Sequence, residues 1–109
     1  MSSRSSAGSN SVAPTIYNVT MTNADTQYSQ QLSQYTKKFL IHTRDESSFR
    51  LAFVTGIVAV PGSPYVTVPS GTRYYEDGVF LRVQTADWNG TLYFASDDAG
   101  KIIEILEWV

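Results

Sequence analysis

Short runs of alternating residues, divided by turn-forming residues, constrain the fold of this chain more than any other feature. In one run, Phe39 and Ile41 would point to one side of a strand, and Leu40 and His42 to the other. β-branched and aromatic residues recur in these runs, as is typical of strands. We therefore predict strands at 16–21, 38–43, 49–54, 65–68, 79–84, 92–94 and 101–109.

The segments between these runs are typical of tight turns. Asn89-Gly90 favours the positive φ of a type I′ hairpin turn, and residues 97–100 form a second turn sequence. Together they predict that residues 79–109 form a three-stranded meander. Residues 61–64 contain two prolines and a glycine, so this segment is predicted to be a loop.

Residues 24–36 are ambiguous. Tyr28, Leu32 and Tyr35 fall at helical spacing, and the segment has no Gly or Pro. Alternatively, residues 26–30 form a strand followed by a loop. Because the rest of the chain has strand character, we favour the strand.

Seven or eight short strands at this spacing predict a single all-β domain over residues 15–109. The expected architecture is an antiparallel β-sandwich or jelly roll, with a small barrel as the alternative. The run 101–109 carries apolar residues on both faces, so it is predicted to be a central strand covered on both sides.

The Ser-rich residues 1–14 lack the apolar area that would offset their ordering entropy, so they predict a flexible arm. This arm is either a disordered leader or a segment that becomes ordered along a neighbouring subunit.

Composition argues against several functional classes. A net charge of −2 provides no basic field for nucleic acid. No apolar run approaches the length needed to cross a membrane, and the N-terminus lacks the apolar segment of a signal peptide, so we expect synthesis in a cytoplasm.

The absence of Cys excludes disulfides and thiolate metal sites. Only 17% of residues are charged, which fits a surface largely covered by partners, although a neutral soluble β-domain would look similar.

Catalytic candidates are few. His42 is the only histidine, so a catalytic triad or His-dependent metal site would have to include it, yet its run is typical of an ordinary strand. The acidic pairs 45–46, 76–77 and 97–98 lie beside turns, where carboxylates accept backbone hydrogen bonds. Alternatively, these carboxylates could bind a calcium ion or form the catalytic carboxylate pair of a glycosidase. We expect no enzyme activity, no cofactor and no metal.

Residues near loops are the best candidates for an interface. Tyr74, Tyr75 and Trp88 would offer flat apolar faces to a protein partner or a sugar, with Arg73 and Arg82 as weaker candidates. The strands carry few charges to protect open sheet edges. Pairing with further copies would satisfy those edges, so a homo-oligomer is expected.

One further pattern extends over most of the chain. It lies in segments 36–44, 49–53, 68–77, 92–96 and 99–108. Through these segments, residues 15–109 resemble small virion structural proteins of tailed bacteriophages. The resemblance implies a particle component without enzyme activity, such as a capsid decoration (cement) protein of β-sandwich type. Such a protein would bind the major capsid protein or other virion proteins, often through a terminal arm, and stabilise the head.

The alternative is a carbohydrate-binding or adaptor module of the tail, neck or fibre, with Tyr74, Tyr75 and Trp88 as the glycan platform. The resemblance itself assigns no functional residues.

Overall fold

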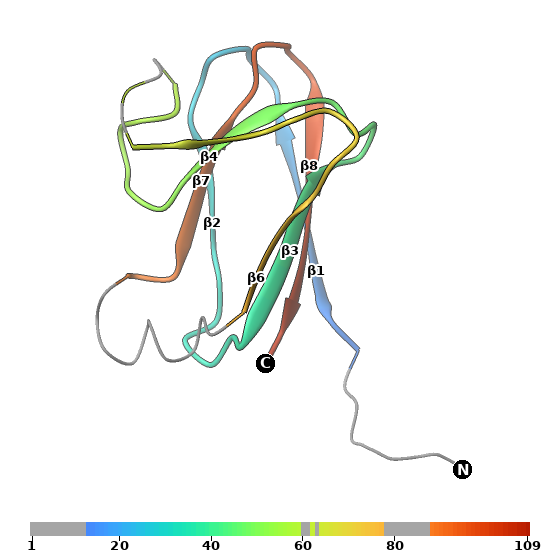
Figure 1. Cartoon of the computed structure of the whole chain (residues 1–109), viewed down its shortest axis with the longest axis vertical. Helices are drawn as coiled ribbons and strands as arrows, with labels where there is room; N and C mark the ends of the chain where they lie inside the picture. The colour runs from blue at the N-terminus through green and yellow to red at the C-terminus, as the bar shows by residue number, and fades with distance from the viewer. Residues whose placement is uncertain (1–12, 60–61, 63, 78–87) are drawn as a thin grey trace.

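The described residues form two antiparallel sheets of four strands each. Figure 1 shows the two sheets. The computed structural model describes residues 13–59, 62, 64–77 and 88–109, and this part of the chain contains no helix. The strands are β1 (Thr15–Met21), β2 (Tyr28–Gln31), β3 (Lys38–Thr43), β4 (Phe49–Ala52), β5 (Val66–Val68), β6 (Tyr74–Asp77), β7 (Thr91–Ala95) and β8 (Lys101–Trp108).

The strand pairing is nested. One sheet, sheet A, has the order β1-β8-β3-β6, and the other, sheet B, has the order β2-β7-β4-β5. Strands equally far from the two ends of the series pair with each other: β1 with β8, β2 with β7, β3 with β6 and β4 with β5. The pairs β3–β8 and β4–β7 then complete the sheets. Consequently, among the strands that the structure describes, successive strands lie in different sheets except for β4 and β5.

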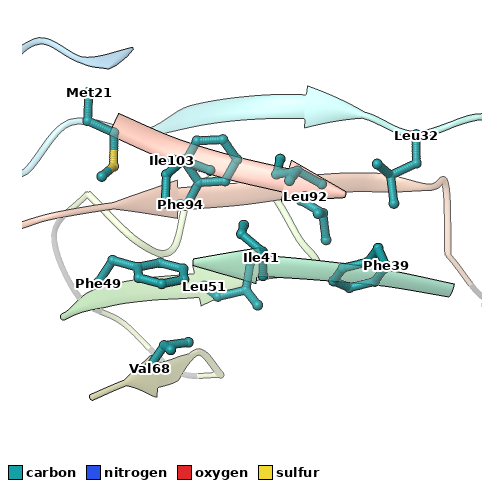
Figure 2. Close-up of a cluster of buried hydrophobic side chains, with 11 residues drawn as sticks. Met21, Leu32, Phe39, Ile41, Phe49, Leu51, Val68, Leu92, Phe94 and Ile103 are labelled. Atoms are coloured by element: carbon teal, nitrogen blue, oxygen red, sulfur yellow. The ribbon is translucent and has the colours of Figure 1, made fainter. Parts of the chain in front are cut away.

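The alternating pattern of each strand places one apolar face of each sheet against the other. In β3, Phe39 and Ile41 are fully buried, whereas Leu40 and His42 are half-buried on the outer side. The buried side chains gather between the two sheets (Figure 2). Burial of this shared apolar surface holds the sheets together. The core consists of Met21, Leu32, Phe39, Ile41, Phe49, Leu51, Val68, Leu92, Phe94, Ile103 and Ile105.

Most predicted strands are confirmed within a few residues. In the ambiguous segment 24–36, the structure has the strand β2 and no helix. The run 49–54 ends early, at Ala52, and its predicted alternation is confirmed: Phe49 and Leu51 lie in the core, and Arg50 and Ala52 lie on the other face, where they are buried as well. Both lie under the loop after β4, whose Val58 packs on Ala52 and Ala95. The predicted strand 79–84 lies outside the described residues, as do residues 1–12 of the predicted arm.

The predicted meander over residues 79–109 is wrong at its C-terminal half. β7 belongs to sheet B and β8 to sheet A, so the turn at 97–100 passes between sheets. Gly100 has a φ of 82° and its N–H donates to the Met21 carbonyl, which starts the β1–β8 pairing. The central position of β8 is confirmed, but its outer residues Ile102, Leu106 and Trp108 are only half-buried. No helix in the described part of the chain is long and apolar enough to cross a bilayer.

Replacing Phe94 by alanine tests the core. The Phe94 ring is fully buried between the sheets, so Phe94→Ala should lower the free energy of unfolding by about 3–5 kcal/mol. Val54→Ala is the control, because Val54 is 57% exposed and its loss should change stability by less than about 0.5 kcal/mol. Chemical denaturation followed by tryptophan fluorescence measures both, and similar effects would contradict this core.

Candidate functional site

A row of apolar side chains crosses the outer face of sheet A. Ile16 lies opposite Leu106, Leu106 opposite Leu40, and Leu40 opposite Tyr75, so the row passes over all four strands. Cross-strand partners project from the same side of a sheet. Ile16 is 61% exposed and Tyr75 51%, while Leu40 and Leu106 are half-buried. We call these four residues the apolar row.

Charged and polar residues border the apolar row on both sides. On one side, Lys38 lies between Trp108 and Asp77 in the register, and its Nζ is 5.1 Å from the centroid of the Trp108 ring. On the other side, His42 lies opposite Glu104, with 3.7 Å between His42 Nε2 and Glu104 Oε1. An apolar centre with a polar rim is the usual anatomy of a protein–protein interface.

The outer face of sheet B differs, because part of it is covered by the chain itself. Arg50 on β4 is 7% exposed, and its Nε donates to the Val58 carbonyl at 2.8 Å. Its Nη1 pairs with Asp97, and its Nη2 lies 2.9 Å from Asp25 Oδ1. Burial opposes the charge on Arg50, but the two carboxylates outweigh that effect and raise its pKa. This bonding fixes the loop 53–59 on the sheet, so Arg50 has a structural role.

A buried carboxylate connects β1, β8 and the loop between β2 and β3. Glu107 is 2% exposed and points toward the core side of β8. It accepts hydrogen bonds from the Tyr17 hydroxyl at 2.8 Å, from the Ser33 N–H at 2.6 Å and from the Thr36 hydroxyl. The pKa of Tyr17 is raised to about 12, mainly by burial and secondly by the hydrogen bond to Glu107. Both oxygens of Glu107 have donors, so this group is also structural.

The residues predicted as an interface do not lie on one face. Tyr74 and Tyr75 are neighbours on β6 and point to opposite sides of sheet A. Tyr74 stacks on Phe39 at 6.0 Å between ring centroids, and Trp88 meets Phe53 edge-on at 5.2 Å. Both rings are half-buried against the core, so Tyr74, Tyr75 and Trp88 do not form a single platform.

Of the predicted interface residues, only Tyr75 belongs to the apolar row. Arg73 is exposed, with its Nη2 3.9 Å from Glu46 Oε2. Arg82 lies outside the described residues. Ile16, Leu40 and Leu106 were not among the predicted interface residues. Each is an apolar residue on the face of its strand that does not point into the core. Such a residue indicates an exposed apolar surface only once the neighbouring strands are known.

The groups considered for chemistry have other contacts. His42 Nδ1 lies 2.9 Å from the Thr43 carbonyl oxygen. Asp45 accepts a hydrogen bond from Lys101 Nζ at 2.6 Å and another from the Ser47 N–H, and Lys101 holds the pKa of Asp45 well below its usual range. This confirms the turn role predicted for Asp45. The described residues contain no group of three or more His, Cys, Asp or Glu side chains that could hold a metal ion.

No protein-family model, curated protein or solved structure matches this chain.

Replacing Tyr17 by phenylalanine tests the Glu107 network. Tyr17→Phe keeps the ring and removes one hydrogen bond to the buried carboxylate, so we expect a loss of about 1–3 kcal/mol in unfolding free energy at pH 7. Folding raises the pKa of Tyr17 from 10.0 to about 12, so the protonated phenol favours the folded state. This contribution is complete below pH 10 and is lost as the pH rises to about 12.

The difference in the free energy of unfolding between wild type and Tyr17→Phe should therefore become smaller as the pH rises from 10.0 to about 12. Urea denaturation at a series of pH values measures it, with Tyr65→Phe at a 40% exposed tyrosine as the control. A difference that does not change with pH would contradict the predicted raised pKa.

Replacing Arg50 by lysine tests the covering of sheet B. Lysine keeps the charge but cannot reproduce the forked contacts to Asp25, Asp97 and the Val58 carbonyl, so we expect a loss of about 1–3 kcal/mol. Arg44→Lys is the matched control, since Arg44 is exposed and its pair with Glu104 contributes at most about 1 kcal/mol. Denaturation curves compare the two, and an equal response would rule out the structural role of Arg50.

Proposed function

We propose that this chain is a structural module without enzyme activity that binds a protein surface through the outer face of sheet A. We further propose that this surface belongs to a virus particle, where the chain acts as a capsid decoration protein. The observation that carries the proposal is the apolar row, Ile16–Leu106–Leu40–Tyr75, which crosses four strands and ends in two exposed side chains.

The nested pairing supports a finer description of the fold. Pairing β1 with β8, β2 with β7, β3 with β6 and β4 with β5 is what results when a long antiparallel ribbon is folded over into two facing sheets. We infer that the domain is a jelly roll, a fold found in viral capsid and lectin domains. Because one fold serves many functions, the jelly roll supports the proposal without deciding it.

The chemistry of the outer face favours a protein as the partner. Positive residues, Lys38 and Arg44, alternate with negative ones, Asp77 and Glu104, so no single-sign field would attract a phosphate backbone. A sugar site of stacked aromatics has little support, because the Tyr74 and Trp88 rings pack against the core. The resemblance of residues 15–109 to virion structural proteins suggests a phage head as that partner.

The proposal predicts that a charge in the apolar row will weaken binding to phage heads. Heads are prepared from a phage deletion strain that lacks this chain, and purified protein is added back and co-sedimented. Tyr75→Asp should weaken binding at least about tenfold, because the exposed ring would be buried at the interface. Tyr65→Asp is the matched control, at an exposed tyrosine preceding β5 in sheet B. Absence of wild-type binding, or equal binding by Tyr75→Asp and wild type, would refute the proposal.

A further inference from the structure

We propose that the same face mediates self-association, with sheet A of one copy packed on sheet A of a second copy about a two-fold axis. The axis runs parallel to the strands and passes between β8 and β3. This inference rests on the proposed function, because it takes the outer face of sheet A as the binding surface. A second copy occupies that face in the free protein and has to dissociate before the same face can bind a phage head.

The order of strands in sheet A makes the apolar row complementary to itself. Rotation about this axis exchanges β8 with β3 and β1 with β6. Ile16 then faces Tyr75 of the second copy, and Leu106 faces Leu40 of the second copy. Each contact occurs twice, as the symmetry of an isologous dimer requires.

The polar residues beside the row are complementary about the same axis. Glu104 faces His42 of the second copy, so two acid–imidazole pairs form across the interface. Trp108 faces Lys38 of the second copy, which repeats between copies the cation–π contact present within each chain at 5.1 Å. The charges therefore favour this arrangement at both borders of the row.

The alternative axis, along the apolar row, fits the charges poorly. It would keep each strand over its own copy and exchange the two borders. Lys38 would then face His42 of the second copy, and the Trp108 ring would face the Glu104 carboxylate. A carboxylate over the negative face of an aromatic ring is repelled, and Lys38 would face an imidazole in place of an aromatic ring. Charge complementarity therefore selects the axis parallel to the strands.

The outer face of sheet B is partly covered by a loop, and this explains why sheet A is the sheet proposed for self-association. The loop 53–59 packs Val58 onto Ala52 and Ala95 and so covers apolar surface outside sheet B. The Arg50 hydrogen bond to the Val58 carbonyl holds that loop in place. On sheet A, Ile16 and Tyr75 are more than half exposed, so a second copy would bury surface that the described residues leave open.

Two charge substitutions test both the surface and the axis. Ile16→Lys and Tyr75→Glu should each weaken dimerisation at least about tenfold in sedimentation equilibrium, relative to wild type. An equimolar mixture of the two should associate within about threefold of wild type. In the mixed dimer, one contact joins the introduced lysine to the introduced glutamate, and the other keeps the native Ile16 and Tyr75. Under the alternative axis, positions 16 and 75 would each face themselves, and mixing would create no such pair.

Matched controls and a second measurement address folding. Val54→Lys and Tyr65→Glu place the same charges on residues that are 57% and 40% exposed outside sheet A, and should leave dimerisation unchanged. Because the chain contains no cysteine, Ile16→Cys and Tyr75→Cys can also be mixed and treated with a bis-maleimide crosslinker that spans the roughly 10 Å between packed sheets. Crosslinks joining position 16 to position 75 should then form in preference to 16–16 and 75–75 crosslinks.

Three results would overturn the inference. They are a wild-type chain that stays monomeric up to about 1 mM, charge variants that dimerise like wild type, and a mixture that does not recover association. A monomeric wild type whose binding to phage heads is lost in Tyr75→Asp would overturn self-association and leave the proposed function intact. A chain that dimerises and whose variants recover on mixing, but that does not bind heads even at concentrations where it is monomeric, would support self-association and refute the virion role.

Discussion

The burial of two apolar sheet faces against each other is the constraint on which the rest of the structure depends. Phe39, Ile41 and Ile105 from sheet A meet Leu51 and Phe94 from sheet B in one cluster. Removal of this surface from water is the main favourable contribution to folding. Because each strand has a period of two, filling this core also fixes which residues face outward. The outer surface of sheet A is thus a consequence of how its core is packed.

Glu107 and Arg50 are charged residues that are nevertheless buried in the described part of the chain, and both connect loops to the sheets. A buried charge is costly unless it is paired and hydrogen-bonded. Glu107 meets this condition with donors from Tyr17, Ser33 and Thr36, and so connects the β2–β3 loop to β1 and β8. Arg50 meets it on the outside of sheet B and holds the following loop there. Sheet B therefore covers part of its own outer face, and sheet A keeps the apolar row exposed.

The exposure of the aromatic residues near loops depends on tertiary contacts that the local sequence does not show. Tyr74, Tyr75 and Trp88 stand near turns in the sequence, where exposed aromatics are expected. In the folded chain, Tyr74 and Trp88 join Phe39 and Phe53 at the margin of the core, so their position near loops does not make them exposed. Only Tyr75 projects from the outer face. It acquires its neighbours there from strands far away in the sequence.

Sequence alone determined most of the strand content, because alternation and turn residues act over a few neighbouring positions, but it did not predict β6, whose acidic residues Glu76 and Asp77 were assigned to a turn. It placed the strands now labelled β1, β3 and β8 nearly at their observed bounds, and favoured a strand over a helix before Leu32. Tertiary structure decided the pairing. The predicted meander was wrong because the turn at 97–100 can join strands of one sheet or of two, and Gly100 bonds to Met21 rather than back to β7. The apolar row exists only after β1, β8, β3 and β6 are aligned, since cross-strand neighbours are set by long-range packing.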